Sequence, residues 1–164
     1  MTEETVPDPF SEARLGPLTL RNRIIKAATF EGRTGNNQVG PELIEFHRQM
    51  AAGGVGMTTV AYIAVSPDGR GAPNELVVTD ENAPGLRKLA DTVHAEGAAL
   101  SGQIGHAGAV AASAGLAGLS PSRFFNPLSM KRTKEMTPED FKRVPEAFAD
   151  TSRRLVDCGF DAIE

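Results

Sequence analysis

The chain has 164 residues, of which 40% are hydrophobic and 23% charged, and its formal net charge is −4 at pH 7. These values are typical of a globular domain with one core, and they provide no clustered positive charge for nucleic acid or an anionic membrane surface. No apolar run approaches the roughly 20 residues that span a bilayer, and the single cysteine, Cys158, excludes an internal disulfide and fits the cytoplasm.

Strand and helix patterns alternate from the first third of the chain onward. A short strand is predicted over residues 18–20 and a first core strand over residues 24–30. A polar loop follows, and Pro41 and Gly53 mark the start and the end of a helix. Residues 55–65 are rich in β-branched side chains, which favours a second core strand.

The same alternation continues in the second half. Apolar residues recur at i, i+3, i+4 and i+7 between Pro84 and Gly97, which predicts an amphipathic helix. The stripe consists of Leu86, Leu89, Ala90 and Val93. A third strand is predicted over residues 98–104, and a long loop of small residues over 105–136.

The last predicted helix begins at Thr137 and Pro138, an N-cap followed by proline at the first helical position. Pro145 lies inside it and is expected to kink or split it. The residues expected on one face are Phe141, Val144, Phe148 and Leu155. Gly159 ends the helix, and residues 160–164 read as a fourth strand.

Strands separated by helices predict an α/β fold with parallel strands and right-handed crossovers. The pattern alone leaves two architectures open, an open doubly wound sheet or part of a (β/α)8 barrel. Residues 1–9 are expected to form a flexible N-terminus and residues 10–164 the folded domain. Because the last segment reads as a buried strand, we expect the chain to be the front part of a larger fold, truncated at its fourth strand.

Ligands of parallel α/β folds meet the carboxyl ends of the strands, which here are residues 27–30, 61–63 and 103–106. Gln103 carries a carbonyl and an amide that suit a planar heterocycle, or else it is a satisfied core amide. His106, in a glycine-rich turn, is interpreted as a residue that pins its loop. The histidines are scattered without partners at ligand spacing, so no metal site is expected.

Three further groups have structural interpretations. His47 lies among charged neighbours and is predicted to be on the surface. His94 lies in the last turn of its helix, where a cation complements the helix dipole. Cys158 is interpreted as a buried structural thiol and not as a nucleophile.

Six segments then match, in order and with correct spacing, motifs of one family. They are L-R-N-R-I-I (20–25), A-A-G-G-V-G (51–56), A-V-S-P-D-G-R (64–70), V-H-A-E-G (93–97), Q-I-G-H-A-G (103–108) and G-F-D-A-I-E (159–164). The series resembles the N-terminal portion of the Old Yellow Enzyme family, the FMN-dependent NADH:flavin oxidoreductases and ene-reductases. Any one match is weak, and the series is specific.

The resemblance implies a partial TIM barrel, the first four βα steps, with FMN at the carboxyl mouth and NAD(P)H as hydride donor. It implies that Ala27, Ala28, Thr29 and Phe30 contact the flavin largely through backbone groups. Tyr62 stands where the family usually has a small flavin-contacting residue. Gln103 matches the glutamine that hydrogen-bonds the isoalloxazine edge. Phe30 departs from the family, because it replaces a Cys or Thr able to donate a hydrogen bond.

The family's substrate-binding histidine pair is expected just after Glu164, so the resemblance places no catalytic residue in this chain. We therefore expect weak or no FMN binding and no turnover by the chain alone. The complete protein is expected to pass hydride to a small-molecule substrate such as an activated alkene. The alternatives are a non-catalytic half barrel that self-associates or is completed by another chain, and an unrelated nucleotide-binding α/β domain.

Overall fold

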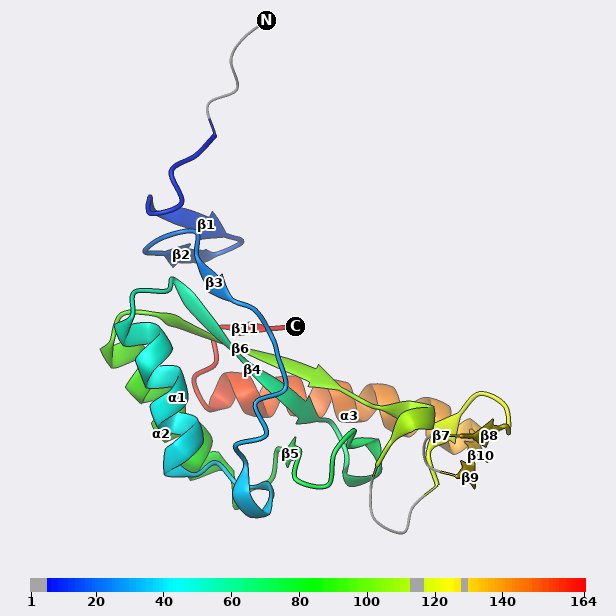
Figure 1. Ribbon diagram of the computed structural model, residues 1–164. Helices are drawn as coiled ribbons and strands as arrows, with labels where there is room; N and C mark the ends of the chain where they lie inside the picture. The colour runs from blue at the N-terminus through cyan, green and yellow to red at the C-terminus, as the bar shows by residue number, and fades with distance from the viewer. Residues whose placement is uncertain (1–5, 113–116, 128–129) are drawn as a thin grey trace, which may run out of the picture.

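The computed structural model describes residues 6–112, 117–127 and 130–164. Its centre is a parallel sheet in the order β11–β6–β4–β3, with β5 paired to the end of β4 (Figure 1). The strands are β3 (Ile25–Lys26), β4 (Met57–Ala64), β5 (Leu76–Val77), β6 (Ala99–Gly105) and β11 (Ala162–Ile163). The α/β class with parallel strands is confirmed, and β3 is shorter than the predicted strand over residues 24–30.

Three helices connect these strands and pack against the sheet (Figure 1). They are α1 (Pro41–Ala52), α2 (Ala83–Ala95) and α3 (Pro138–Asp157). The predicted stripe of α2 is confirmed, because Leu86, Leu89, Ala90 and Val93 are all buried. The helices bury apolar side chains against β4 and β6, and this burial supplies the main driving force for the fold.

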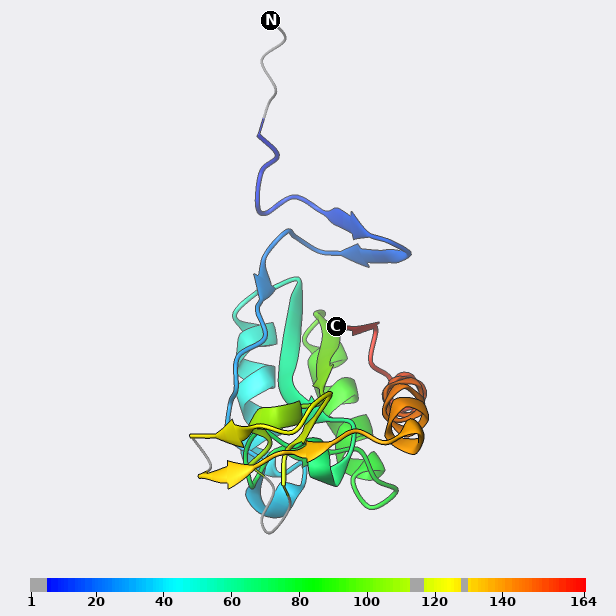
Figure 2. The same ribbon diagram turned by 90° about the vertical axis from the view of Figure 1, so that its right-hand side faces the viewer.

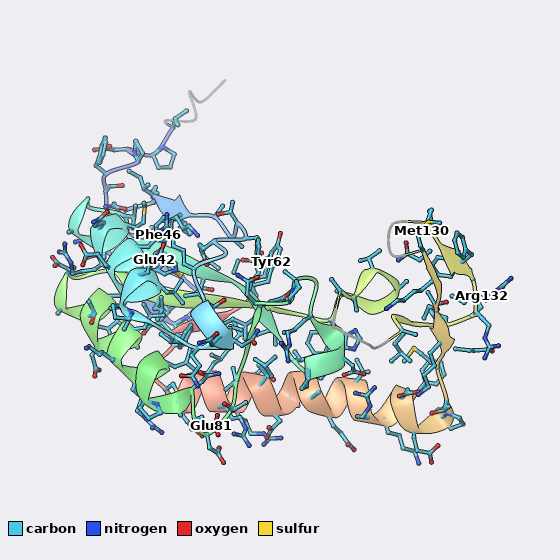
Figure 3. The ribbon with its side chains drawn as sticks, turned by 60° about the horizontal axis from the view of Figure 1, so that its bottom comes forward. Glu42, Phe46, Tyr62, Glu81, Met130 and Arg132 are labelled. Atoms are coloured by element: carbon cyan, nitrogen blue, oxygen red, sulfur yellow. The ribbon has the colours of Figure 1, made fainter. Side chains whose placement is uncertain are left out.

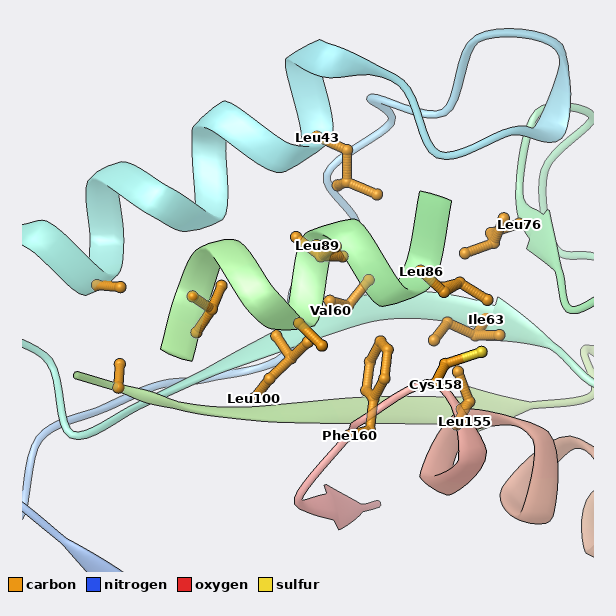
Figure 4. Close-up of a cluster of buried hydrophobic side chains, with 14 residues drawn as sticks. Leu43, Val60, Ile63, Leu76, Leu86, Leu89, Leu100, Leu155, Cys158 and Phe160 are labelled. Carbon is orange, nitrogen blue, oxygen red and sulfur yellow. The ribbon is translucent and has the colours of Figure 1, made fainter. Parts of the chain in front are cut away.

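One cluster of buried side chains forms the core between the sheet and the helices (Figure 4). It comprises Leu43, Ala51, Val60, Ile63, Leu76, Leu86, Leu89, Ala90, Val93, Ala98, Leu100, Leu155, Cys158 and Phe160. Gly102 on β6 allows close packing here, because a Cβ at this position would lie 3.2 Å from Ile63 Cδ1 and from the Phe160 ring. Cys158 is buried, as the sequence interpretation holds.

Small two-stranded sheets lie at both ends of the central sheet (Figures 1 and 2). The antiparallel pair β1 (Ala13–Leu15) and β2 (Leu18–Leu20) lies beyond the amino end of β3. At the opposite end, β7 (Leu119–Ser120) pairs with β10 (Lys134–Glu135), and β8 (Phe125–Asn126) pairs with β9 (Lys131–Arg132). The prediction of one long loop over residues 105–136 is therefore wrong for the described part of this range, because short strands pair within it.

Three short 3-10 turns complete the described elements: η1 (Gly35–Asn37), η2 (Pro67–Gly69) and η3 (Gly108–Val110). Of these, η2 follows shortly after β4 and begins at Pro67. The flexibility predicted for residues 1–9 stays a prediction, and residues 1–5 lie outside the described part of the chain.

Helix α3 differs from its prediction in two respects. It runs without a break from Pro138 to Asp157, although Pro145 lies within it. A capping box between Thr137 and Asp140 satisfies backbone groups at its start. Its buried residues are Asp140, Thr151 and Leu155, whereas Phe141 is 58% exposed. The predicted face is therefore only partly buried.

Candidate functional site

Two aromatic side chains stand at the carboxyl end of the sheet. Phe30 follows β3 and Tyr62 lies on β4; their ring centroids are 6.0 Å apart and their planes differ by 21°. Each side chain is 45% exposed. Figure 3 labels Tyr62 near this end of β4, apart from Met130 and from Arg132 on β9. The pair therefore offers an accessible aromatic surface beside two strand ends.

A cavity of about 430 Å³ opens beside Tyr62. Gln103 and His106, at the end of β6, line it together with Glu75 and Glu164. The Gln103 side chain donates from Nε2 to Glu164 Oε1 over 2.9 Å. Its Oε1 atom is buried and has no hydrogen-bond partner among the described residues. Gln103 therefore carries a buried acceptor whose hydrogen-bonding capacity no described residue satisfies.

The His106 ring is fixed on two sides. Its Nδ1 atom accepts a hydrogen bond from the Gly108 backbone N–H over 3.0 Å. Its face lies on Gly69, where a Cβ would come within 2.6 Å of His106 Cδ2. Ala107 also donates its backbone N–H to Gly69 O over 2.7 Å. These contacts agree with the interpretation that His106 pins its loop.

The six predicted cofactor-binding residues divide into two groups in the structure. Phe30, Tyr62 and Gln103 come together, since Phe30 stacks on Tyr62 and Tyr62 shares the cavity with Gln103. Ala27, Ala28 and Thr29 follow β3 without strand pairing and are not among the residues that line this cavity. Their predicted flavin contacts stay predictions.

A buried charged network below the aromatic pair escaped the sequence reasoning. Glu31 Oε1 lies 2.5 Å from Lys26 Nζ, and the two side chains are only 3% and 13% exposed. His47 Nε2 lies 3.6 Å from the same oxygen, and His47 Nδ1 is 2.8 Å from Thr58 Oγ1. The prediction that His47 is on the surface is wrong: it is fully buried. The sequence does contain a signal for this burial, because His47 lies four residues after Leu43 and four before Ala51, on the same face of α1.

Two carboxyl groups near the site have pKa values shifted in opposite directions. Burial alone would raise the pKa of Glu31, but contacts with His47 and Lys26 and the Ala61 N–H bring it below its ordinary value. Burial raises the pKa of Glu75, only partly opposed by hydrogen bonds from the Gly71 and Ala72 backbone N–H groups. The two groups therefore make opposite contributions to the pH dependence of stability.

We expect Glu75→Gln to become more stabilising relative to the unmodified chain as the pH rises from about 4 to about 8. The folded-state pKa of Glu75 is raised, so its contribution to stability is fully present below the unfolded-state value and is lost as pH rises through the folded-state value. Urea unfolding of both proteins across this pH range measures the difference.

Glu31→Gln supplies the control with the opposite sign. The pKa of Glu31 is lowered in the folded state, so its stabilising contribution is present above the unfolded-state value and disappears as pH falls through the folded-state value. This variant should lose more stability at high pH than at low pH. Parallel slopes for the two variants would contradict the assignment.

Two simple classes of site find no support in the described residues. Across residues 6–112, 117–127 and 130–164, no group of three or more His, Cys, Asp or Glu side chains is arranged to hold a metal ion. Within the same ranges no helix combines the length and the apolar character needed to cross a bilayer.

His94, interpreted as structural, pairs with Asp161 through Nε2 and Oδ2 over 2.8 Å.

Comparison with known sequences gives consistent matches along the chain. The profile of the NADH:flavin oxidoreductase / NADH oxidase family matches residues 9–164. The 4,4'-dithiodibutanoate disulfide reductase of Rhodococcus erythropolis is 51% identical over 100% of this chain and 41% of its own length. A metal reductase of Desulforamulus reducens is 38% identical over 94% of this chain and 24% of its own length. The chain thus spans less than half of these relatives.

Solved structures share the fold. A 2-naphthoyl-CoA reductase complex superimposes with a TM-score of 0.86 at 26% identity, over 94% of this chain and 26% of that chain. The Old Yellow Enzyme from Pichia sp. AKU4542 gives 0.86 at 20% identity, over 94% of this chain and 44% of the other. The architecture is therefore part of a (β/α)8 barrel, and the open doubly wound alternative is excluded.

Proposed function

This chain belongs to the NADH:flavin oxidoreductase / NADH oxidase family. We therefore propose that it forms the part of an FMN-dependent NAD(P)H oxidoreductase that contacts the edge of the flavin ring. Bound FMN supplies a ring that takes hydride from NAD(P)H and gives it to the acceptor. The described residues contribute binding and orientation to this chemistry. No catalytic residue is assigned to them, and the chain alone is expected to lack turnover.

The observation that carries this proposal is the Gln103 side chain, which lines a cavity beside an exposed aromatic pair. The pyrimidine edge of an isoalloxazine carries an N–H donor between two carbonyl acceptors. A primary amide matches such an edge, because it has one acceptor and two donors. Tyr62 and Ile104 provide apolar cavity wall for a planar ring. The residues present therefore fit the ring of FMN.

The same residues fit the phosphate of FMN poorly. TIM barrels commonly hold phosphate groups with the loops after the seventh and eighth strands. The described parallel sheet contains β3, β4, β6 and β11, which we match to the first four barrel strands, with β5 at its edge. We therefore propose that this chain contacts the ring end of FMN and binds it weakly.

We expect Gln103→Leu to weaken FMN binding by about fivefold, equivalent to about 1 kcal/mol for one lost hydrogen bond. Titration of the 164-residue chain, followed by quenching of flavin fluorescence, measures the affinity. Riboflavin should bind the unmodified chain as well as FMN does, because we assign no phosphate-binding group to the described residues.

Gln49→Leu is the matched control, since Gln49 is exposed on α1 and only donates to Glu45. It should bind FMN like the unmodified chain. Equal affinity of the Gln103 and Gln49 variants would contradict the role of the Gln103 amide.

For the acceptor we propose an activated alkene or a similar electron-poor group, as the family resemblance implies. The 51% identity to a disulfide reductase makes an organic disulfide a second acceptor to assay. The hydride donor, NADH or NADPH, is assayed in the same reactions. We also propose a cytoplasmic location, which the presence of a single, unpaired cysteine supports.

A second candidate is a binding or assembly module. The observation in its favour is that, among the described residues, β3 and β11 each pair on one side, which leaves two open sheet edges. Sedimentation of the chain, alone and mixed with the remaining part of a family barrel, tests this function. A monomer that does not bind the added part would exclude it.

A further inference from the structure

Glu31 joins the segment after β3 to the end of β4 through two hydrogen bonds to one residue. Its backbone N–H donates to Ala61 O over 3.2 Å, and its Oε2 atom accepts from the Ala61 N–H over 3.0 Å. Phe30 precedes Glu31 in the chain, and Tyr62 follows Ala61. The two residues that stack therefore flank the two residues that are joined.

The carboxylate is held in place by buried side chains on other elements. Lys26 Nζ lies 2.5 Å from Glu31 Oε1 and also donates to Thr59 O over 2.9 Å. His47 on α1 approaches the same oxygen to 3.6 Å. Lys26 Nζ further lies 5.4 Å from the centre of the Phe46 ring. Such contacts from β3, α1 and β4 leave the carboxylate little freedom to move.

We propose that Glu31 is a positioning residue that fixes the stacked Phe30–Tyr62 pair as one wall of the flavin site. Its influence on the ligand rests on the function proposed above, whereas its influence on the aromatic pair does not. In this proposal the Glu31 carboxylate does not itself contact the flavin. It acts through the Ala61 backbone, which fixes the position of the next residue on β4, Tyr62.

Tyr62 gives this proposal a specific signal. It is the only tyrosine in the chain, and the chain has no tryptophan. The tyrosine band of the near-ultraviolet circular dichroism spectrum, and the quenching of tyrosine fluorescence by acrylamide, therefore report on one side chain. We expect Glu31→Ala to lose most of the tyrosine dichroism and to increase quenching, because the Ala61 N–H loses its acceptor and the strand end loosens.

Val93→Ala is the control for general loss of stability. Val93 is fully buried on α2 near the amino end of the sheet, where Ala98 N donates to Val93 O. This variant should be less stable than the unmodified chain yet keep the Tyr62 signals. Unchanged Tyr62 signals in Glu31→Ala, or equal losses in both variants, would overturn the proposal.

A charge-neutral double variant provides a rescue test if Glu31→Ala does not fold. Glu31→Gln alone leaves one of two donors, Lys26 Nζ or the Ala61 N–H, facing an amide NH2 group. Lys26→Met with Glu31→Gln removes that conflict and keeps an acceptor for Ala61. The double variant should regain the Tyr62 dichroism that the single variant loses. Failure to regain it would contradict positioning through Ala61.

Flavin titration of the same proteins separates the two proposals. Glu31→Ala is expected to bind FMN several-fold more weakly than the unmodified chain, and Val93→Ala equally well. If the unmodified chain binds no flavin while Tyr62 still responds to Glu31→Ala, the proposed function fails and the positioning role stands. If the unmodified chain binds flavin and neither variant differs from it, the positioning role toward the ligand fails.

Discussion

Replacing Leu100 by alanine is expected to lower the free energy of unfolding by about 3 kcal/mol, within the range of roughly 2 to 5 kcal/mol for buried leucines. Leu100 is fully buried on β6, between the helices and Phe160 (Figure 4). Truncation removes the transfer free energy of its side chain and leaves a cavity that the sheet cannot fill. Because domains are stable by about 5 to 15 kcal/mol, this is a large fraction of the total.

Urea unfolding followed by far-ultraviolet circular dichroism measures this loss. Leu15→Ala is the control, because Leu15 is a leucine of β1 that is 45% exposed. It should cost well under 1 kcal/mol. A loss of similar size at both positions would show that Leu100 does not belong to the core described here.

Replacing Gly69 by alanine is expected to displace the His106 ring and to cost about 1 to 3 kcal/mol through overpacking. The new Cβ would lie 2.6 Å from His106 Cδ2 and 2.9 Å from His106 Cγ. Both distances are too short for carbon atoms that are not bonded, so the ring must move. Moving the ring strains the hydrogen bond that Nδ1 accepts from the Gly108 N–H. NMR of the His106 imidazole and urea unfolding follow the two effects together.

Gly105→Ala is the matched control for this change. Gly105 lies at the end of β6, directly before His106, and a Cβ there meets no atom within 4 Å. The variant should leave both the stability and the His106 resonances nearly unchanged. Shifted imidazole resonances in Gly105→Ala but not in Gly69→Ala would contradict the described packing.

Periodicity predicted the elements that bury a regular face. The stripe of α2 was predictable because its four apolar residues alone occupy one side, and all are buried against β4 and β6. The prediction for α3 was weaker, since Phe141 lies on the part of the helix that leaves the sheet. The strands β7 to β10 were not predictable, because each is only two residues long, and β7 pairs with β10 from a separate segment of the chain.

The site residues on the strands were predictable from the sequence, whereas the charged residues around Glu31 were not. Gln103 stands out because it is polar at the end of an apolar strand, and it lines the cavity beside Tyr62. Glu31 gives no such signal, because a glutamate in a polar loop is expected to be exposed to solvent. Only the tertiary fold brings Lys26, His47 and Ala61 around it. Burial of an ion pair depends on neighbours that no local pattern encodes.

The most direct test of the flavin site is an NMR titration of the isotope-labelled 164-residue chain with FMN. The account predicts weak binding, with the largest amide shifts at Phe30, Tyr62 and Gln103. It would be contradicted by the absence of any shift. Shifts centred instead on the cavity of about 330 Å³ between α2 and α3, which Arg87 and Arg153 line, would contradict it equally.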